Sequence, residues 1–165
     1  MHDYQVMRIC VKRYLDRLAA WKRDTDELQA RLLESKARAE LLSGVSYDKI
    51  GNSPNANADA IANAVIRNEE LATMLADAIN TLQDEYMEAW RFCNLGGEEC
   101  RFRKTVWLYL VEQRQWDFVA RRVCTSKRNA QRWFKQGIEE IYGFMPELSK
   151  RDAFPNAAPT DYTRY

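Results

Sequence analysis

Nine of the polar and basic side chains between positions 121 and 135 are of types that could contact DNA. They are Arg121, Arg122, Ser126, Lys127, Arg128, Asn129, Gln131, Arg132 and Lys135. In a helix that begins after Ser126, spacings of three and four turn most of them to one face. Arginine can form two hydrogen bonds with guanine, and a side-chain amide can do the same with adenine. We therefore predict DNA recognition, with Gln131 reading adenine, Arg128 reading guanine, and Lys127, Arg132 and Lys135 contacting phosphates.

The apolar residues around this cluster predict three short helices within residues 98–143. The residues expected to face inward are Phe102, Val106, Tyr109 and Leu110, then Trp116, Val119, Ala120 and Val123, and finally Ala130, Trp133, Phe134, Ile138 and Ile141. Ser126 is a suitable N-cap for the third helix. A short helix, a tight connection and a longer capped helix predict a helix-turn-helix DNA-binding domain. A basic three-helix cap with solvated arginines is the alternative.

Cys124 occupies the position in the turn where glycine is usual. A left-handed backbone at cysteine costs on the order of 1 kcal/mol or more. A longer turn, or one that is not left-handed, would avoid that cost.

The formal net charge of +1 is distributed unevenly along the chain. Residues 100–135 contain ten bases and two acids, whereas residues 59–99 contain nine acids and two bases. The near-neutral total therefore conceals a basic segment that suits a nucleic-acid partner.

Two long segments before the basic cluster repeat apolar or small residues at alternating spacings of four and three. The first repeat comprises Met7, Val11, Tyr14, Leu18, Trp21, Thr25, Leu28, Leu32, Ser35, Ala39 and Leu42. The second comprises Ile61, Val65, Asn68, Ala72, Leu75, Ile79, Leu82, Tyr86, Ala89 and Cys93. Because a seven-residue repeat keeps one helical face toward a partner helix, we predict an antiparallel coiled-coil hairpin over residues 3–95.

The hairpin is expected to contain a mobile loop at residues 44–58, where glycine, asparagine and proline favour turns, with Asp59 capping the second helix. We expect two copies to form a homodimer through the coiled coil. Asn68 either fixes its register or is solvated at an edge. Residues 146–165 contain three prolines and are predicted to be an extended tail. The fold class is therefore all-α.

Other classes of protein are disfavoured. The only histidine is His2, and the four cysteines form no CxxC pair, so we expect no catalytic site, metal or cofactor. Reduced cysteines fit an intracellular protein. Neither a signal peptide nor a membrane span is recognisable, and we expect a cytoplasmic protein.

The chain resembles small prophage proteins related to the ArpU- and RinA-type phage late transcription regulators. The residues that carry the resemblance are Tyr14-Leu15 and Leu18, the break at 43–58, Tyr109-Leu110, residues 116–120, Ser126, and Gly137 to Ile141. This chain has Phe118 and Cys124 where that family often has Glu and Gly. The resemblance implies a bacteriophage or prophage transcription regulator in a bacterial host cell, with a helix-turn-helix similar to region four of sigma factors. It leaves open a contact with RNA polymerase.

Two alternative functions remain open. A phage DNA-packaging protein, such as a small terminase subunit, would assemble as a ring of many copies. A helical interaction adaptor would use its acidic second helix to bind a basic partner, and it would not bind DNA.

Overall fold

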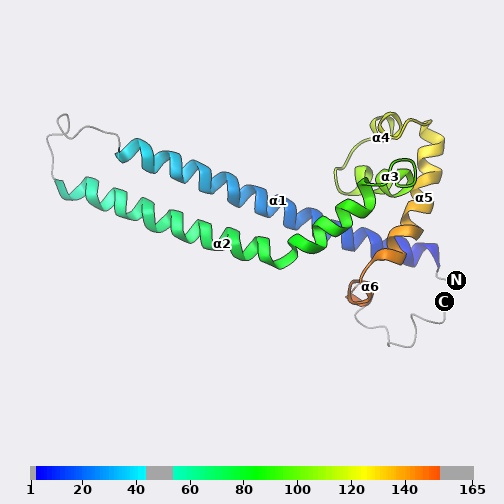
Figure 1. Cartoon of the computed structure of the whole chain (residues 1–165), viewed down its shortest axis with the longest axis horizontal. Coiled ribbons are helices and arrows are strands. Elements are labelled where there is room, and N and C mark those ends of the chain that lie inside the picture. The colour runs from blue at the N-terminus through cyan, green and yellow to red at the C-terminus, as the bar shows by residue number, and fades with distance from the viewer. Residues whose placement is uncertain (1–2, 44–53, 153–165) are drawn as a thin grey trace. The chain divides into compact units, whose positions relative to one another are not determined.

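The computed structural model describes residues 3–43 and 54–152 of the chain and folds them into six helices. These helices are α1 (Tyr4–Ser43), α2 (Pro54–Asn94), α3 (Arg101–Leu110), α4 (Trp116–Arg122), α5 (Lys127–Phe144) and α6 (Glu147–Asp152), labelled in Figure 1. No strand occurs in these two ranges, which confirms the all-α prediction for them. None of these helices is long and apolar enough to span a membrane.

The chain divides into two compact units at positions other than the predicted domain boundaries. Unit 1 combines the residues up to Ala20 with those from Asp84 onward, and unit 2 comprises Trp21 to Gln83. The first turns of α1 therefore share a unit with α3, α4 and α5 rather than with the rest of the predicted hairpin.

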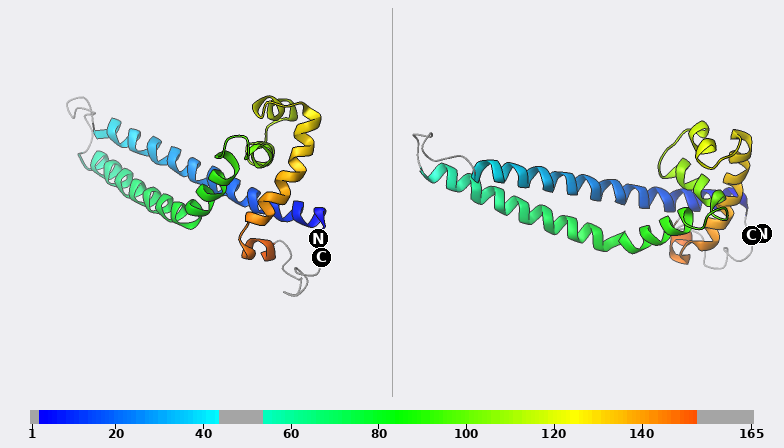
Figure 2. Two further views of the ribbon diagram at one scale, coloured as in Figure 1. Left: turned by 45° about the vertical axis from the view of Figure 1, so that its right-hand side comes forward. Right: turned by 45° about the horizontal axis from the view of Figure 1, so that its top comes forward.

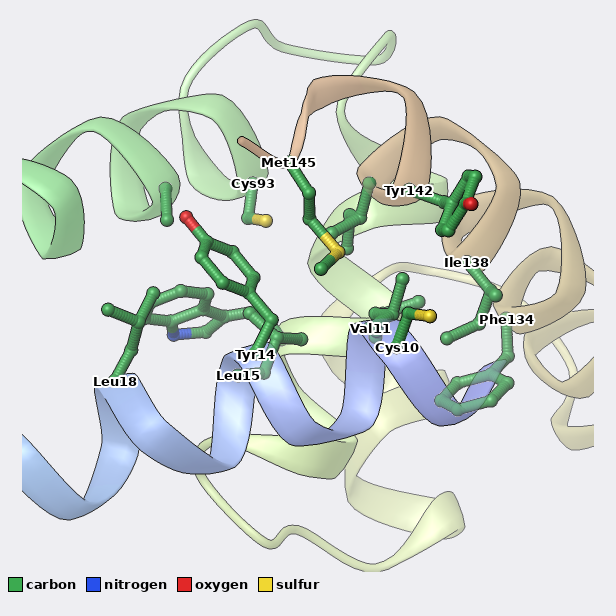
Figure 3. Packing of buried hydrophobic residues seen from close by; sticks show 14 residues of the cluster. Cys10, Val11, Tyr14, Leu15, Leu18, Cys93, Phe134, Ile138, Tyr142 and Met145 are labelled. Carbon is green, nitrogen blue, oxygen red and sulfur yellow. The ribbon is translucent and has the colours of Figure 1, made fainter. Parts of the chain in front are cut away.

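The core of unit 1 is built from segments that are far apart in the sequence. Val11, Leu15 and Leu18 of α1 are completely buried, and they pack in one cluster with Trp107 of α3 and Ile138 of α5. Figure 3 shows side chains from α1, α2 and α5 converging on this cluster. Burial of such side chains contributes roughly 1.5–3 kcal/mol each, so the first turns of α1 are an integral part of unit 1.

The buried thiols of Cys10 and Cys93 belong to the same core cluster, and that of Cys100 is buried outside it. Cys10, Cys93 and Cys100 are buried and free, and burial raises the pKa of the Cys93 thiol to about 12. Because thiolates are the reactive form of cysteine, a thiol kept neutral in this way acts as a small apolar side chain.

Helix α5 packs directly against the backbone of α3 at Gly137. A Cβ atom at this position would collide with the carbonyl oxygen of Phe102 and would lie 2.7 Å from Val106 Cγ2. Glycine is therefore required here for close approach of the two helices, although it is a weak helix former.

In unit 2, the parts of α1 and α2 lie side by side in all three views of Figures 1 and 2. The indole Nε1 of Trp21 donates a hydrogen bond to the carbonyl oxygen of Ala78 over 2.5 Å. Thr25 and Leu32 of the first predicted repeat are buried, and Thr25 donates its hydroxyl hydrogen bond back to Trp21. The first repeat is thus correctly placed at these positions.

The second repeat is wrong by one residue at two positions. Val65 and Ala72 are exposed, whereas Ala64 and Leu71 are partly buried in their place. The helix contains two overlapping apolar series, and the buried one starts with a spacing of three rather than four. Asn68 is common to both series, and its Oδ1 atom is buried without a hydrogen-bond partner in the described part of the chain.

Two predicted irregular segments are helical in part. Helix α2 begins at Pro54, so residues 54–58 do not belong to the predicted loop and Asp59 is not the cap. Proline suits the first turn of a helix because it has no N–H group to leave unbonded there. The rest of the predicted loop, residues 44–53, lies outside the described residues.

The predicted extended tail contains α6. The Lys150 ammonium pairs with Glu147 at 2.6 Å, and Arg17 of α1 donates a hydrogen bond to Ser149 Oγ at 3.2 Å. Both Ser149 and Lys150 are buried, so this segment packs against the rest of unit 1 instead of extending away from it. Residues 153–165 lie outside the described residues.

We predict that Gly137→Ala destabilises the protein although alanine favours helix formation. The new methyl group forces α3 and α5 apart, and overpacking of this kind typically costs about 1–3 kcal/mol. Urea unfolding monitored by circular dichroism measures the change in the free energy of unfolding.

Gly143→Ala is the matched control, because Gly143 lies in the same helix and a Cβ there meets no atom within 4 Å. It should be neutral or should stabilise by up to about 1 kcal/mol. Equal effects of the two substitutions would contradict the close-approach role of Gly137.

Candidate nucleic-acid interface

The connection between α4 and α5 is a tight turn with a left-handed residue at Cys124. The φ angle of Cys124 is 54°. The N–H of Cys124 donates to Arg121 O at 3.2 Å, and the N–H of Thr125 donates to Ala120 O at 2.9 Å. These two bonds form a Schellman motif, in which the residue that Cys124 replaces is usually glycine. The chain thus adopts the left-handed turn rather than the longer alternative.

The buried faces of the three short helices agree with the prediction. Val119 and Ala130 are completely buried, Ala120 and Val123 almost so, and Trp133 is partly buried. The inward residues of α5 fix its rotation about its own axis, and the rotation determines which side chains face solvent.

All nine predicted site residues have exposed side chains on α4, on α5 or at the cap of α5. Ser126 caps α5 as predicted, because its hydroxyl oxygen accepts a hydrogen bond from Asn129 N at 3.2 Å. The nine residues therefore lie exposed on two consecutive helices and on the cap that precedes the second one.

The bases in this group differ in their partners. The Lys127 ammonium lies 3.3 Å from a carboxylate oxygen of Asp117, and Arg121 Nε donates to the Asp117 backbone carbonyl at 3.2 Å. Lys135 lies 5.1 Å from the centre of the Tyr4 ring, within cation–π range. Arg128 and Arg132 form no ion pair within the described ranges, so their guanidinium groups are available to a ligand.

Asp117 was not among the predicted site residues. It lies in the first turn of α4, where a carboxylate interacts favourably with the helix dipole. Its ion pair with Lys127 positions that side chain at the start of α5. In the sequence, only two features point to a role for Asp117 at this site. It lies ten residues before Lys127, and it is an acidic residue in a basic segment.

The charged groups of this surface do not include a cluster suited to a metal ion. Within residues 3–43 and 54–152, no three histidine, cysteine, aspartate or glutamate side chains form a group suited to a metal ion. The arrangement instead offers several positive charges and two amides on an exposed helical face, which suits an extended anionic ligand.

In comparisons with known proteins, no family model matches the chain, and no curated protein or solved structure matches it either.

We predict that Cys124→Gly stabilises the protein by about 1 kcal/mol. Glycine adopts a positive φ without the clash of a Cβ atom. Thermal or urea unfolding measures the gain. Cys124→Ala retains the Cβ atom and removes only the exposed sulfur, so it should show no comparable gain. If alanine and glycine stabilised the protein equally, the left-handed conformation would not be the source of the effect.

Proposed function

We propose that the protein is a sequence-specific DNA-binding transcription regulator of phage or prophage origin, with α4 and α5 as its helix-turn-helix. The observation that carries the proposal is the outward face of α5. Its inner side is buried, whereas its first half presents Arg128, Gln131 and Arg132 to solvent beyond a capped N-terminus. The N-terminal residues of such a helix contact base edges in the major groove.

The two kinds of side chain on α5 are assigned different roles. Gln131 and Arg128 read base edges, because an amide matches adenine and a guanidinium matches guanine. Lys127, Arg132 and Lys135 contact phosphates, with Arg121 and Arg122 of α4 beside them. Ser126 and Asn129, at the start of α5, complete the surface.

Regulation in the cytoplasm of a bacterial host cell is what the resemblance to late transcription regulators implies, and the resemblance leaves open whether RNA polymerase is a further partner. The uneven distribution of acids and bases along the chain and the exposed bases of α4 and α5 are consistent with binding to DNA.

We expect Arg132→Ala to weaken binding to every DNA sequence alike, because the lost contact is to a phosphate. The slope of log K against log salt concentration should become less negative by about 1. Gln131→Ala should instead relax the preference at one base pair, by roughly 1–3 kcal/mol. Fluorescence anisotropy with fragments of the source genome, measured over a salt series, gives both quantities.

Arg91→Ala is a matched control, since Arg91 is an exposed arginine of unit 1 that lies outside α4 and α5. Its binding should equal that of the unmodified protein. Unchanged binding by both α5 variants would refute the recognition-helix assignment, and absence of salt-sensitive DNA binding would favour the interaction adaptor.

We further propose that a coiled coil formed by the helices of unit 2 pairs with that of a second copy. Unit 2 leaves large apolar side chains exposed, and Leu33 of α1 and Val65 of α2 are 61% and 47% accessible. Exposed apolar side chains on long paired helices favour association.

Leu33→Glu should convert the dimer to a monomer, because it places a charge within the apolar contact. Sedimentation equilibrium measures the mass. Asn63→Glu adds the same charge at an exposed polar position of α2 and should leave the dimer intact. A monomer before any substitution would contradict the pairing, and a ring of many copies would favour the packaging protein.

A further inference from the structure

A groove of about 590 Å³ lies beside the turn between α3 and α4, entirely within unit 1. Its lining includes the charged side chains Lys12 and Asp16 of α1, Arg114 of the turn, Asp117 of α4 and Lys127 of α5. Lys127 and Asp117 also belong to the α4–α5 surface. The groove is therefore continuous with the candidate DNA interface and extends it toward α1.

The three bases of the groove are held in weak, exposed ion pairs. Lys12 Nζ lies 2.9 Å from Asp16, with 60% and 48% of the two side chains exposed, and Arg114 Nε lies 3.6 Å from Glu112. Lys127 pairs with Asp117 at 3.3 Å. Because exposed pairs of this kind contribute little to stability, an incoming phosphate can replace the carboxylate as the partner of each base.

The turn between α3 and α4 is fixed in a way that holds Arg114 at the groove. The backbone N–H of Arg114 donates to Leu108 O at 2.9 Å, and Gln113 before it has a left-handed φ of 54°. The Arg114 guanidinium lies 5.0 Å from the centre of the Phe118 ring, within cation–π range. A base positioned by such contacts is suited to a ligand that passes along the surface.

We propose that this groove receives the sugar–phosphate backbone of the bound DNA, with Lys12 and Arg114 as phosphate contacts outside the helix-turn-helix. The inference rests on the proposed function and extends its footprint to α1. Half or more of the hydrogen bonds in protein–DNA complexes go to phosphate and sugar, and the first helix of a helix-turn-helix crosses the backbone. The groove adjoins the first turn of α4, where that backbone would pass. The carboxylates of Asp16 and Asp117 in the groove repel the phosphates and so limit the affinity of the contact.

The test uses the full chain and a DNA duplex that the unmodified protein binds. Lys12→Gln and Arg114→Gln should each weaken binding to all sequences alike and make the salt slope less negative by about 0.9. Asp16→Asn should have the opposite effect and tighten binding, because it removes a repulsive charge and releases Lys12 from its pair. An electrostatic contact predicts that the Lys12 and Asp16 variants change the DNA affinity in opposite directions, whereas a purely structural role does not.

Arg91→Gln, outside the groove, is the matched control and should leave affinity and slope unchanged. Thermal unfolding of each variant verifies that the fold is retained. If Arg132→Ala weakens binding but the Lys12, Arg114 and Asp16 variants bind as the unmodified protein does, the groove assignment is overturned and the helix-turn-helix stands. If the unmodified protein binds no duplex, the proposed function and the groove contact both fail.

Discussion

The contact of α5 with the backbone of α3 at Gly137 is the constraint on which unit 1 depends. Without a side chain at this position, α5 lies close against Phe102 and Val106, and Ile138 of α5 and Trp107 of α3 are buried in one core cluster. Because this contact fixes the rotation of α5, it also determines that Arg128 and Arg132 face solvent. The chemistry of the outer surface therefore depends on the absence of one methyl group on the inner one.

The inner and outer faces of α4 and α5 were predictable from the sequence because few alternatives exist. In α5, apolar side chains recur on one side and bases on the other, so a single rotation buries Ala130 and Ile138 while leaving the bases in water. The same reasoning was less reliable for α2, which is rich in alanine. Two overlapping apolar series fit there, and periodicity alone does not decide whether Ala64 or Val65 faces inward.

Other features depend on contacts that a linear pattern does not contain. Periodicity shows that the first turns of α1 have an apolar face, but it does not show that Leu15 packs with Trp107 instead of with the rest of a hairpin. Similarly, the helix at Glu147 is too short to be recognised by a repeat, and it is held by Arg17 and by burial of Lys150. The left-handed Cys124 is retained because the hydrogen bonds and buried side chains around it determine the turn together.

Unit 1 is built from two segments that are separated in the sequence by unit 2. This arrangement has a consequence for synthesis on the ribosome. Trp107, which belongs to the same core cluster as Leu15, is synthesised roughly a hundred residues after it, and this takes several seconds at ~5–20 residues per second. During that interval, unit 2 is complete in sequence and can fold first. When the two helices of unit 2 pair, residues that are distant in the sequence come together, as in the hydrogen bond from Trp21 to Ala78. Folding of unit 2 would thereby shorten the effective loop between the two halves of unit 1 and lower the entropic cost of joining them.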